Sequence, residues 1–373
     1  MSSYGRSLQA LHRGLASQAR NLRTFPLSEG RSQLVAMVEG DFAATLSRST
    51  QLALWAAEEA LADFSAKERA ETAIILGGTT GGMSGTEAHF LDAPLGGIEA
   101  FTAQTVAQHP VYEVTNVLAE KLALGGPRST LISACSSGLN TTIMAQRWLA
   151  AGVAKRVLAV GTDALCRLTL TGFASLGAVD PQGARPFQRE RQGISIGEGA
   201  AAFVIEKEGA RPARARLLGN AIVAEAFHAT QPDPSGAGAE RAMREAMREA
   251  GLSAGDIDAV SAHGTGTPHN DSMECAAIAR LFGDSAGPLV SSQKSQLGHT
   301  LGAAGSLELA ACVAMLEHGV VYATHGLSAE NLDPSCAKVA HVFGAPAMRK
   351  VRAILKNSFA FGGQNACVVV GAA

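Results

Sequence analysis

The chain has 373 residues, of which 47% are hydrophobic and 17% charged, an ordinary composition for a globular protein with one large domain or two half-size ones. Its 31 basic and 33 acidic residues give a formal net charge of −2, without a long block of like charge. This balance excludes a strongly basic surface, so we expect neither nucleic acid nor a membrane among the partners.

The cysteines are scattered, with no C-x-x-C pair and no Cys/His group at metal-ligand spacing, so we expect no bound metal. Most should be buried thiols in a reducing compartment. No run of about 18 apolar residues is present to cross a bilayer, and the N-terminus lacks the apolar stretch of a secretory signal; we therefore predict a cytoplasmic location. The six cysteines are Cys135, Cys166, Cys275, Cys312, Cys336 and Cys367.

Residues 1–30 are rich in arginine and serine and contain one acidic residue, Glu29. This composition resembles an organellar transit peptide, but we interpret the segment as part of the folded chain. The first clear strand signal comes later, at residues 72–76 (TAIIL), and leads into a glycine-rich turn at residues 77–85. Because this turn lacks the Gly-Lys-Ser/Thr ending of a phosphate-binding loop, the sequence does not support nucleotide binding.

The rest of the chain alternates short apolar runs with helical segments. In the first half, strands are predicted at residues 130–134, 156–160 and 201–205, with a helix that ends at Ala150 after the first of them. Such alternation is typical of an α/β protein whose mostly parallel strands are covered by helices. In the second half, we predict helices at residues 241–250, 271–282 and 305–318 and strands at residues 259–262, 289–292, 352–356 and 366–370.

The two halves have similar lengths and the same alternation, and no short repeat of 20–50 residues is visible. We therefore predict an internally duplicated, layered α/β fold rather than a solenoid. The dividing segment is expected at residues 209–215 (GARPARA), which are polar and contain proline. This places the two halves at residues 1–212 and 213–373.

Cys135 lies in the sequence SACSSG, directly after a predicted apolar strand and before a predicted helix. At the start of a helix, a thiol faces the positive end of the helix dipole and free backbone N–H groups, so we expect its pKa to be lowered. The same turn would offer a backbone N–H to an oxyanion formed on an attacked thioester. The alternative is a buried structural cysteine, which is our interpretation of the other five.

Two histidines share this setting at the end of a predicted strand. His263 lies in AHGTGT, and His299 ends the sequence KSQLGH. Either histidine alone would more often be a core or loop residue than a catalyst. Together with Cys135 they form a set of three, each on a turn flanked by glycine or serine, and α/β folds gather their ligand sites at such strand ends.

Four ordered blocks make the chain resemble a known family. They are residues 133–138 (SACSSG), 263–268 (HGTGTP), 294–305 (KSQLGHTLGAAG) and 357–363 (NSFAFGG). From about Thr72 to its C-terminus, the chain resembles the β-ketoacyl-acyl-carrier-protein synthases of the elongating, Cys-His-His type. The resemblance implies the thiolase-like fold, in which two duplicated halves form a layered α-β-α-β-α architecture.

The resemblance also implies a role for each matching residue. Cys135 would take an acyl chain from the phosphopantetheine of an acyl carrier protein or from coenzyme A. His263 and His299, with Lys294 beside them, would stabilise the enolate that forms as a malonyl unit loses carbon dioxide, and no cofactor is expected. Asp271, Glu274 and Glu308 match supporting acids, whereas Thr265, Thr267, Phe361 and Gly362 match substrate-binding positions, Phe361 being the gate and an oxyanion-hole N–H.

Three departures from the family pattern are visible. No strand with a Thr-Gly-x-Gly turn precedes Thr72, so we expect a shortened or rebuilt first layer. In the gating loop, Ala360 replaces the usual glycine and Gln364 the usual threonine. The added methyl group of Ala360 reduces the backbone conformations open to a loop that must move. We therefore expect the range of acyl chains that the protein accepts to be the property most affected.

Several alternatives remain at this stage. Residues 193–197 (GISIG) fit the nucleophile motif of serine hydrolases, with Ser195 as the nucleophile, but the flanking residues read poorly as a strand and a helix. A degradative thiolase would need a second cysteine where Phe361 and Gly362 stand. A homodimer and a heterodimer with a second ketosynthase-like chain, in which one member sets chain length, both stay open, as do fatty acid, polyketide and polyene synthesis.

Overall fold

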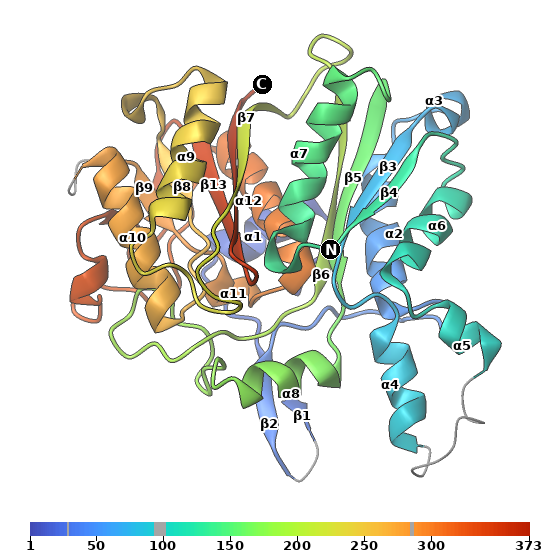
Figure 1. Ribbon diagram of the computed structural model, residues 1–373, viewed down its shortest axis with the longest axis horizontal. Helices are drawn as coiled ribbons and strands as arrows, with labels where there is room; N and C mark the ends of the chain where they lie inside the picture. Colours follow the sequence, from blue (N-terminus) through green and yellow to red (C-terminus); the bar gives the residue numbers. More distant parts are fainter. Residues whose placement is uncertain (28–29, 93–101, 284–286) are drawn as a thin grey trace.

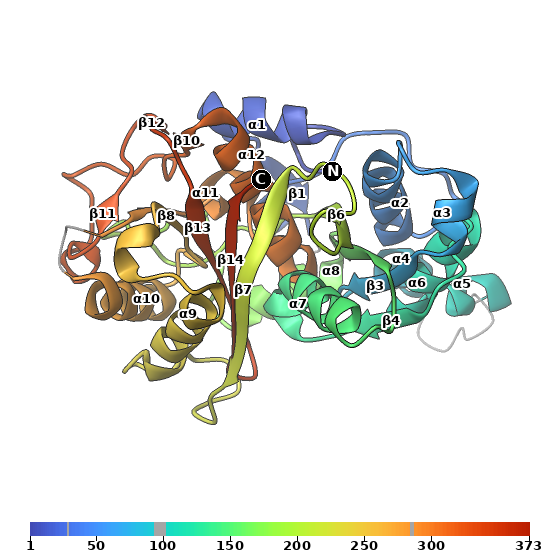
Figure 2. The ribbon, with the colours of Figure 1, turned by 90° about the horizontal axis from the view of Figure 1, so that it is seen from above.

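The computed structural model describes residues 1–27, 30–92, 102–283 and 287–373. In the described residues, two mixed β-sheets lie side by side, one from each half of the chain, with helices between them and on their outer faces (Figures 1 and 2). The core of the molecule therefore consists of several apolar clusters that follow these layers.

The first sheet has the strand order β4-β3-β5-β6, in which the first three strands are parallel and β6 is antiparallel to β5. Helices α2 and α6 pack on its outer face. Strand β3 is buried on both faces, as expected for a parallel strand between helices. The bounds are β3 Ala73–Gly77, β4 Arg128–Leu131, β5 Arg156–Asp163, β6 Gly199–Glu206, α2 Arg48–Ala60 and α6 Val111–Lys121.

The second sheet has the order β11-β9-β8-β13-β14-β7, with parallel pairs as far as β13 and antiparallel pairs beyond it. Helices α9 and α10 cover its outer face. The bounds are β7 Ala215–Ala224, β8 Ala259–Ser261, β9 Leu289–Ser291, β11 Ala340–His341, β13 Ala353–Ala360, β14 Gln364–Ala372, α9 Ala237–Ala250 and α10 Pro268–Phe282.

Helices α7 (Ser137–Ala150) and α12 (Ala304–His318) lie between the two sheets and contact strands of both (Figure 1). Helix α12 is buried on all sides from Ala304 to Leu316, which fits its lack of a polar face. The order helix, sheet, helix, sheet, helix confirms the predicted layered α/β architecture of two similar halves.

The remaining elements surround these layers. Helix α1 packs on α12 through its buried residues Leu11 and Leu15, so this part of the N-terminal segment belongs to the folded body, as expected (Figure 2). The bounds are α1 Leu8–Ala16, β1 Arg23–Pro26, β2 Ser32–Val35, α3 Ala66–Ala70, α4 Met83–Asp92, α5 Ala103–Ala107, α8 Arg167–Ser175, α11 Lys294–Leu297, β10 Val320–Val321 and β12 Ala347–Met348.

The outer edge of β6 shows how the first layer differs from the second. In the second sheet, the last strand β14 pairs with β7, but no strand of the described residues pairs with the outer edge of β6. At this edge, Met1 exchanges two backbone hydrogen bonds with Ala200. A groove of about 1070 Å³ runs along the edge, so the first layer is shortened, as the missing opening strand predicted.

Most predicted elements agree with the structure to within a few residues. The strand predicted at residues 130–134 ends at Leu131, because a 3₁₀ turn, Ala134–Ser136, leads directly into α7. The described cysteines are free and buried. In the described ranges, no helix combines the length and the apolar character that crossing a membrane requires, and no His/Cys/Asp/Glu group suitable for a metal is found.

Candidate active site

Cys135 lies in the 3₁₀ turn between β4 and α7, at the inner end of the layer between the sheets. The residue before it, Ala134, has a φ of +48°, a left-handed conformation that is strained for a residue with a side chain. The turn is held by Ser358, whose hydroxyl donates to the carbonyl of Cys135. Strain of this kind at a buried turn is typical of a functional position.

The environment of the thiol corrects the expectation of a lowered pKa. Burial raises the pKa of Cys135 to about 11, although nearby Lys294 and hydrogen bonds from the backbone of Phe361 and of Cys135 itself act in the opposite direction. Only 7% of the residue is exposed, so the loss of hydration raises the pKa of the thiol by more than the helix terminus lowers it. Cys135 is therefore a thiol at neutral pH, and its deprotonation has to accompany reaction with a substrate.

His263 follows β8 and is buried, and its partners determine which ring nitrogen carries the proton. The ammonium group of Lys294 lies 3.4 Å from Nδ1 and 2.7 Å from the carbonyl oxygen of the same histidine. Because an ammonium group can only donate, Nδ1 is the acceptor and the neutral ring carries its proton on Nε2. His263 is thus a hydrogen-bond donor through Nε2.

The ring of His299 is also protonated on Nε2, because of a different contact. The backbone N–H of Leu301 donates to Nδ1 at 3.2 Å, so the neutral ring again carries its proton on Nε2. The backbone of His299 is fixed on both sides, because its N–H donates to Ser195 and its carbonyl accepts from Gly197. Leu301 itself has a φ of +50°, a second strained turn next to a candidate catalytic side chain.

Close packing of two turns brings Cys135 and His299 together. A methyl group at Gly138, at the start of α7, would lie 2.6 Å from the carbonyl oxygen of Gly302. A methyl group at Gly302 would lie 2.6 Å from the carboxylate of Asp163, which accepts the N–H of Gly302. Only glycine allows this approach, which explains the small residues seen in both sequence blocks.

The rings of His263 and His299 are perpendicular, with centroids 5.5 Å apart, and both line one cavity with Cys135. Burial lowers the pKa of each histidine well below 6.5, and the charge of Lys294 adds to the effect. Both rings are therefore neutral at physiological pH. The structure brings the three predicted residues together as one thiol and two fixed Nε2–H donors.

Lys294 and Glu308 lie behind the histidines and are both buried. Their ion pair measures 2.5 Å, and Lys356, which the sequence did not suggest, contacts the other carboxylate oxygen of Glu308 at 2.8 Å. Burial lowers the pKa of Lys294, an effect that Glu308 opposes and Lys356 reinforces. These groups orient His263 from the side away from the cavity.

Asp271 and Glu274 support the loop that carries His263. The carboxylate of Glu274 accepts hydrogen bonds from the backbone N–H groups of His263 and Gly264 and from the side chain of Asn357. Asp271 accepts from the N–H groups of Phe187 and Gly266. Because both carboxylates are buried, their pKa values are raised, but every one of these contacts favours the charged form.

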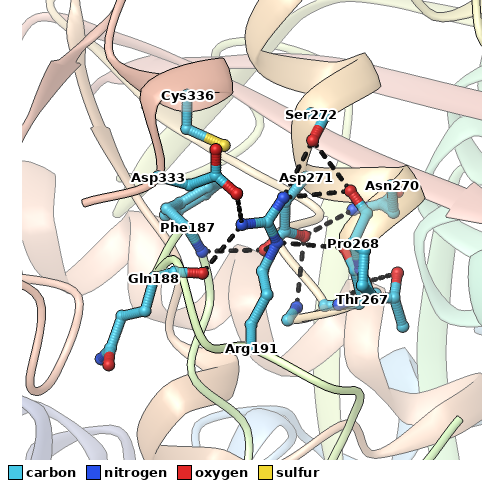
Figure 3. A network of polar contacts seen from close by, with 12 residues as sticks. Phe187, Gln188, Arg191, Thr267, Pro268, Asn270, Asp271, Ser272, Asp333 and Cys336 are labelled. Atoms are coloured by element: carbon cyan, nitrogen blue, oxygen red, sulfur yellow. Dashed lines mark hydrogen bonds and ion pairs between the residues drawn. The ribbon is translucent and has the colours of Figure 1, made fainter. Parts of the chain in front are cut away.

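Arg191 is a further residue that the sequence did not reveal (Figure 3). Its buried guanidinium group forms an ion pair with Asp333 and lies 3.6 Å from Asp271. It also donates to the carbonyl oxygens of Thr267 and Pro268, at the start of α10. Arg191 therefore links the 187–192 segment to the loop that carries His263.

The remaining predicted residues lie on the substrate side of the site. Thr265, Thr267 and Phe361 line the cavity, and the two threonine hydroxyls are 2.9 Å apart. Gly362, predicted as a substrate-binding position, is not among the lining residues, and its N–H donates to the carbonyl of Ala229. The cavity measures about 80 Å³, less than the ~300–1,000 Å³ usual for ligand pockets, so a larger ligand requires this region to open.

The loop around Phe361 is held at both ends. The side chain of Phe361 is 39% exposed and packs against Phe173 of α8, with ring centroids 5.7 Å apart. At the far end, the amide oxygen of Gln364 accepts hydrogen bonds from Ser136 and Asn140. Gln364 therefore links the loop directly to the turn that carries Cys135, a contact that the sequence did not predict.

The structure contradicts the serine-hydrolase alternative. Ser195 is completely buried in an irregular segment, and its hydroxyl accepts a hydrogen bond from the N–H of Ala184. The segment is followed by strand β6 and not by the helix that a nucleophile elbow requires. The part of Ser195 that serves the site is its backbone oxygen, which holds His299.

Comparisons with known proteins show which family the chain resembles. Residues 32–210 match the family model described as the β-ketoacyl synthase N-terminal domain, and residues 214–328 match the corresponding C-terminal domain. The chain is similar to 3-oxoacyl-[acyl-carrier-protein] synthase 2 of Rhizobium meliloti (strain 1021), at 37% identity over 66% of this chain and 61% of that protein. The synthase of the same name from Coxiella burnetii is 33% identical over 80% of this chain and 74% of that one.

A solved structure described as the ishigamide ketosynthase/chain length factor matches the whole of this chain and 96% of that one, with a TM-score of 0.91 and 31% identity. The alignment with the Rhizobium meliloti synthase spans less than two thirds of that relative's length. The similarity therefore covers the whole chain in one comparison and 66% of it in another.

Proposed function

The chain belongs to the β-ketoacyl synthase family, and from that premise we propose that it joins an acyl thioester to a malonyl thioester by decarboxylative Claisen condensation. The observation that carries the proposal is the arrangement of one buried thiol, Cys135, and two Nε2–H donors, His263 and His299, around one cavity. Each element of this arrangement has a task in the reaction.

In the first step, the sulfur of Cys135 attacks the carbonyl carbon of the acyl thioester. The thiol proton passes to the leaving sulfur as the new bond forms, because the resting thiol is protonated and both histidines of the cavity already carry a proton on Nε2. The backbone N–H groups of Cys135 and Phe361 both approach the sulfur and are placed to hold the oxyanion. A new C–S bond forms to Cys135, and the carrier thiol leaves.

In the second step, the thioester oxygen of a malonyl unit lies against the Nε2–H groups of His263 and His299. The bond to the carboxylate breaks, carbon dioxide leaves, and its electron pair forms an enolate whose oxygen the two donors stabilise. The enolate carbon then attacks the acyl group on Cys135, and the cysteine thiolate leaves and takes one proton from the solvent. The reaction balances without an oxidant, a reductant or an external base.

We propose that both substrates arrive on a phosphopantetheine arm, carried by an acyl carrier protein or by coenzyme A. Thr265 and Thr267 support this assignment, because their hydroxyls line the cavity and can bond to amide groups of the arm. The names of the two curated relatives, 3-oxoacyl-[acyl-carrier-protein] synthase 2, favour a carrier protein. The cytoplasmic location stays a prediction that the free, buried thiols support.

A heterodimer with a second ketosynthase-like chain is a further proposal, next to a homodimer. It rests on the similarity to a ketosynthase/chain length factor structure. Since Cys135, His263 and His299 are all present, this chain would be the catalytic member. Strand β4 forms an edge of the first sheet, and Ile132 just after it is 67% exposed, which offers a surface to a second chain. Fatty acid, polyketide and polyene synthesis all fit this chemistry.

The experiment that tests the function is intact-mass spectrometry after incubation with acyl-carrier protein loaded with acyl chains of several lengths. We expect the mass of one acyl group on the wild-type protein, located at Cys135 by peptide mapping, and no acylation of Cys135→Ala. Cys166→Ala is the matched control, because Cys166 is buried outside the cavity lining. Acylation at another residue would overturn the assignment.

A further inference from the structure

Lys356 is a buried lysine for which the mechanism above has no role. It lies on β13 with its side chain completely buried, and its Nζ is 2.8 Å from the Oε2 atom of Glu308. The ammonium group also donates to the carbonyl of Asn357. Because the Oε1 atom of Glu308 contacts Lys294 at 2.5 Å, one buried carboxylate lies between two buried ammonium groups.

This arrangement is not explained by stability alone. A single buried ion pair is close to neutral for folding, because the loss of hydration offsets the attraction. A second ammonium group on the same carboxylate adds another desolvation cost and repels the first. The contact between Lys356 and Glu308 is, moreover, an ion pair without the alignment of a hydrogen bond. Two buried ammonium groups on one carboxylate therefore point to a use for the second charge.

The charge of Lys356 reaches the two histidines by two routes. Through contacts, Lys356 holds Glu308, Glu308 holds Lys294, and Lys294 bonds to Nδ1 and to the carbonyl oxygen of His263. Through space, Lys356 contributes to lowering the pKa of both His263 and His299. The titratable groups around this cluster are Lys294, Glu308, Glu274, Cys312, Cys367 and the two histidines.

We propose that Lys356 is a positioning residue for the condensation: with Lys294 it clamps Glu308, and this clamp keeps His263 and His299 as neutral Nε2–H donors to the malonyl thioester. The proposal deepens, and rests on, the condensing function given above. Lys356 touches neither substrate, because it is outside the cavity lining. Its effect is therefore confined to the malonyl step and absent from acylation of Cys135.

The test uses Lys356→Gln, which retains a hydrogen-bond donor for Glu308 and loses the charge. Removing a positive charge raises the pKa of both histidines, so malonyl decarboxylation should fail at higher pH than in the wild type. We expect the acid limb of its pH–rate profile to move up by about one pH unit, the order of shift that one nearby unit charge produces at an effective dielectric constant of about 20. At neutral pH, kcat should fall about tenfold through misplacement of the donors, with KM and Cys135 acylation almost unchanged.

Two further variants separate charge from shape. Lys356→Arg keeps the charge and should leave the acid limb in place, and exposed Lys350 provides the matched control Lys350→Gln, which should behave as the wild type. If Lys356→Gln does not fold, Lys356→Met, of similar shape, takes its place. If Lys356→Gln or Lys356→Met shows the same acid limb as the wild type, the proposed role of Lys356 is wrong. A wild-type protein that releases no carbon dioxide overturns the condensing function itself.

Discussion

Replacement of His299 by alanine should separate the two steps of the reaction. His299 supplies one of the two Nε2–H donors to the enolate, and removal of one such donor costs about 10²–10³ in rate, or ~2.7–4 kcal/mol of transition-state stabilisation. We therefore expect malonyl decarboxylation by the acylated enzyme to fall by about this factor. Acylation of Cys135 should change only a few-fold, because the oxyanion of that step is held by backbone N–H groups.

The substitution also has a cost in stability that the structure lets us estimate. Without the ring, the buried N–H of Leu301 loses its acceptor, which costs roughly 1–3 kcal/mol, and the thermal midpoint should fall accordingly. Carbon dioxide release and intact-mass acylation are measured on the same preparation. His269→Ala, at an exposed position on α10, is the control. A folded His299→Ala enzyme that decarboxylates within threefold of the wild type would refute the donor role.

Two other predictions follow from the same geometry. Arg191→Met leaves Asp271 and Asp333 without their buried partner, so the free energy of unfolding should fall by about 3–5 kcal/mol. Denaturant titration measures this loss, with the surface variant Arg244→Met as control. A loss below about 1 kcal/mol would show that the network in Figure 3 does not stabilise the fold. The raised pKa of Cys135 predicts that its alkylation by iodoacetamide accelerates with pH up to about pH 11 in the free enzyme, and a plateau already near neutral pH would contradict the effect of burial.

The sequence predicted the architecture and the three central residues because both depend on local patterns. Apolar strands followed by small-residue turns place side chains at strand ends, and parallel strands gather those ends at one edge. The position of each residue at the end of a strand followed from this rule. Cys135 follows β4 of the first sheet and His263 follows β8 of the second, so packing between the two halves brings them together with His299.

The features that the sequence did not reveal depend on contacts between distant segments. The ring proton of His299 is placed by Leu301, two residues away in the chain, but only because a left-handed turn folds its N–H back. The sequence assigned no role to Lys356 or Arg191, because their partners lie on other elements. The pKa of Cys135 was predicted in the wrong direction, because the helix terminus is visible in the sequence and the depth of burial is not.

The most direct test of the whole account is a single turnover. The acylated enzyme, isolated with its acyl group on Cys135, is mixed with malonyl-acyl carrier protein whose chain carbons are isotopically labelled, and the carrier is analysed by mass spectrometry. We predict a β-ketoacyl product two carbons longer than the starting chain, with one carbon dioxide released and the enzyme returned to its free mass. Hydrolysis of the acyl group without a longer product, or carbon dioxide release that leaves the acyl group on Cys135, would contradict the account.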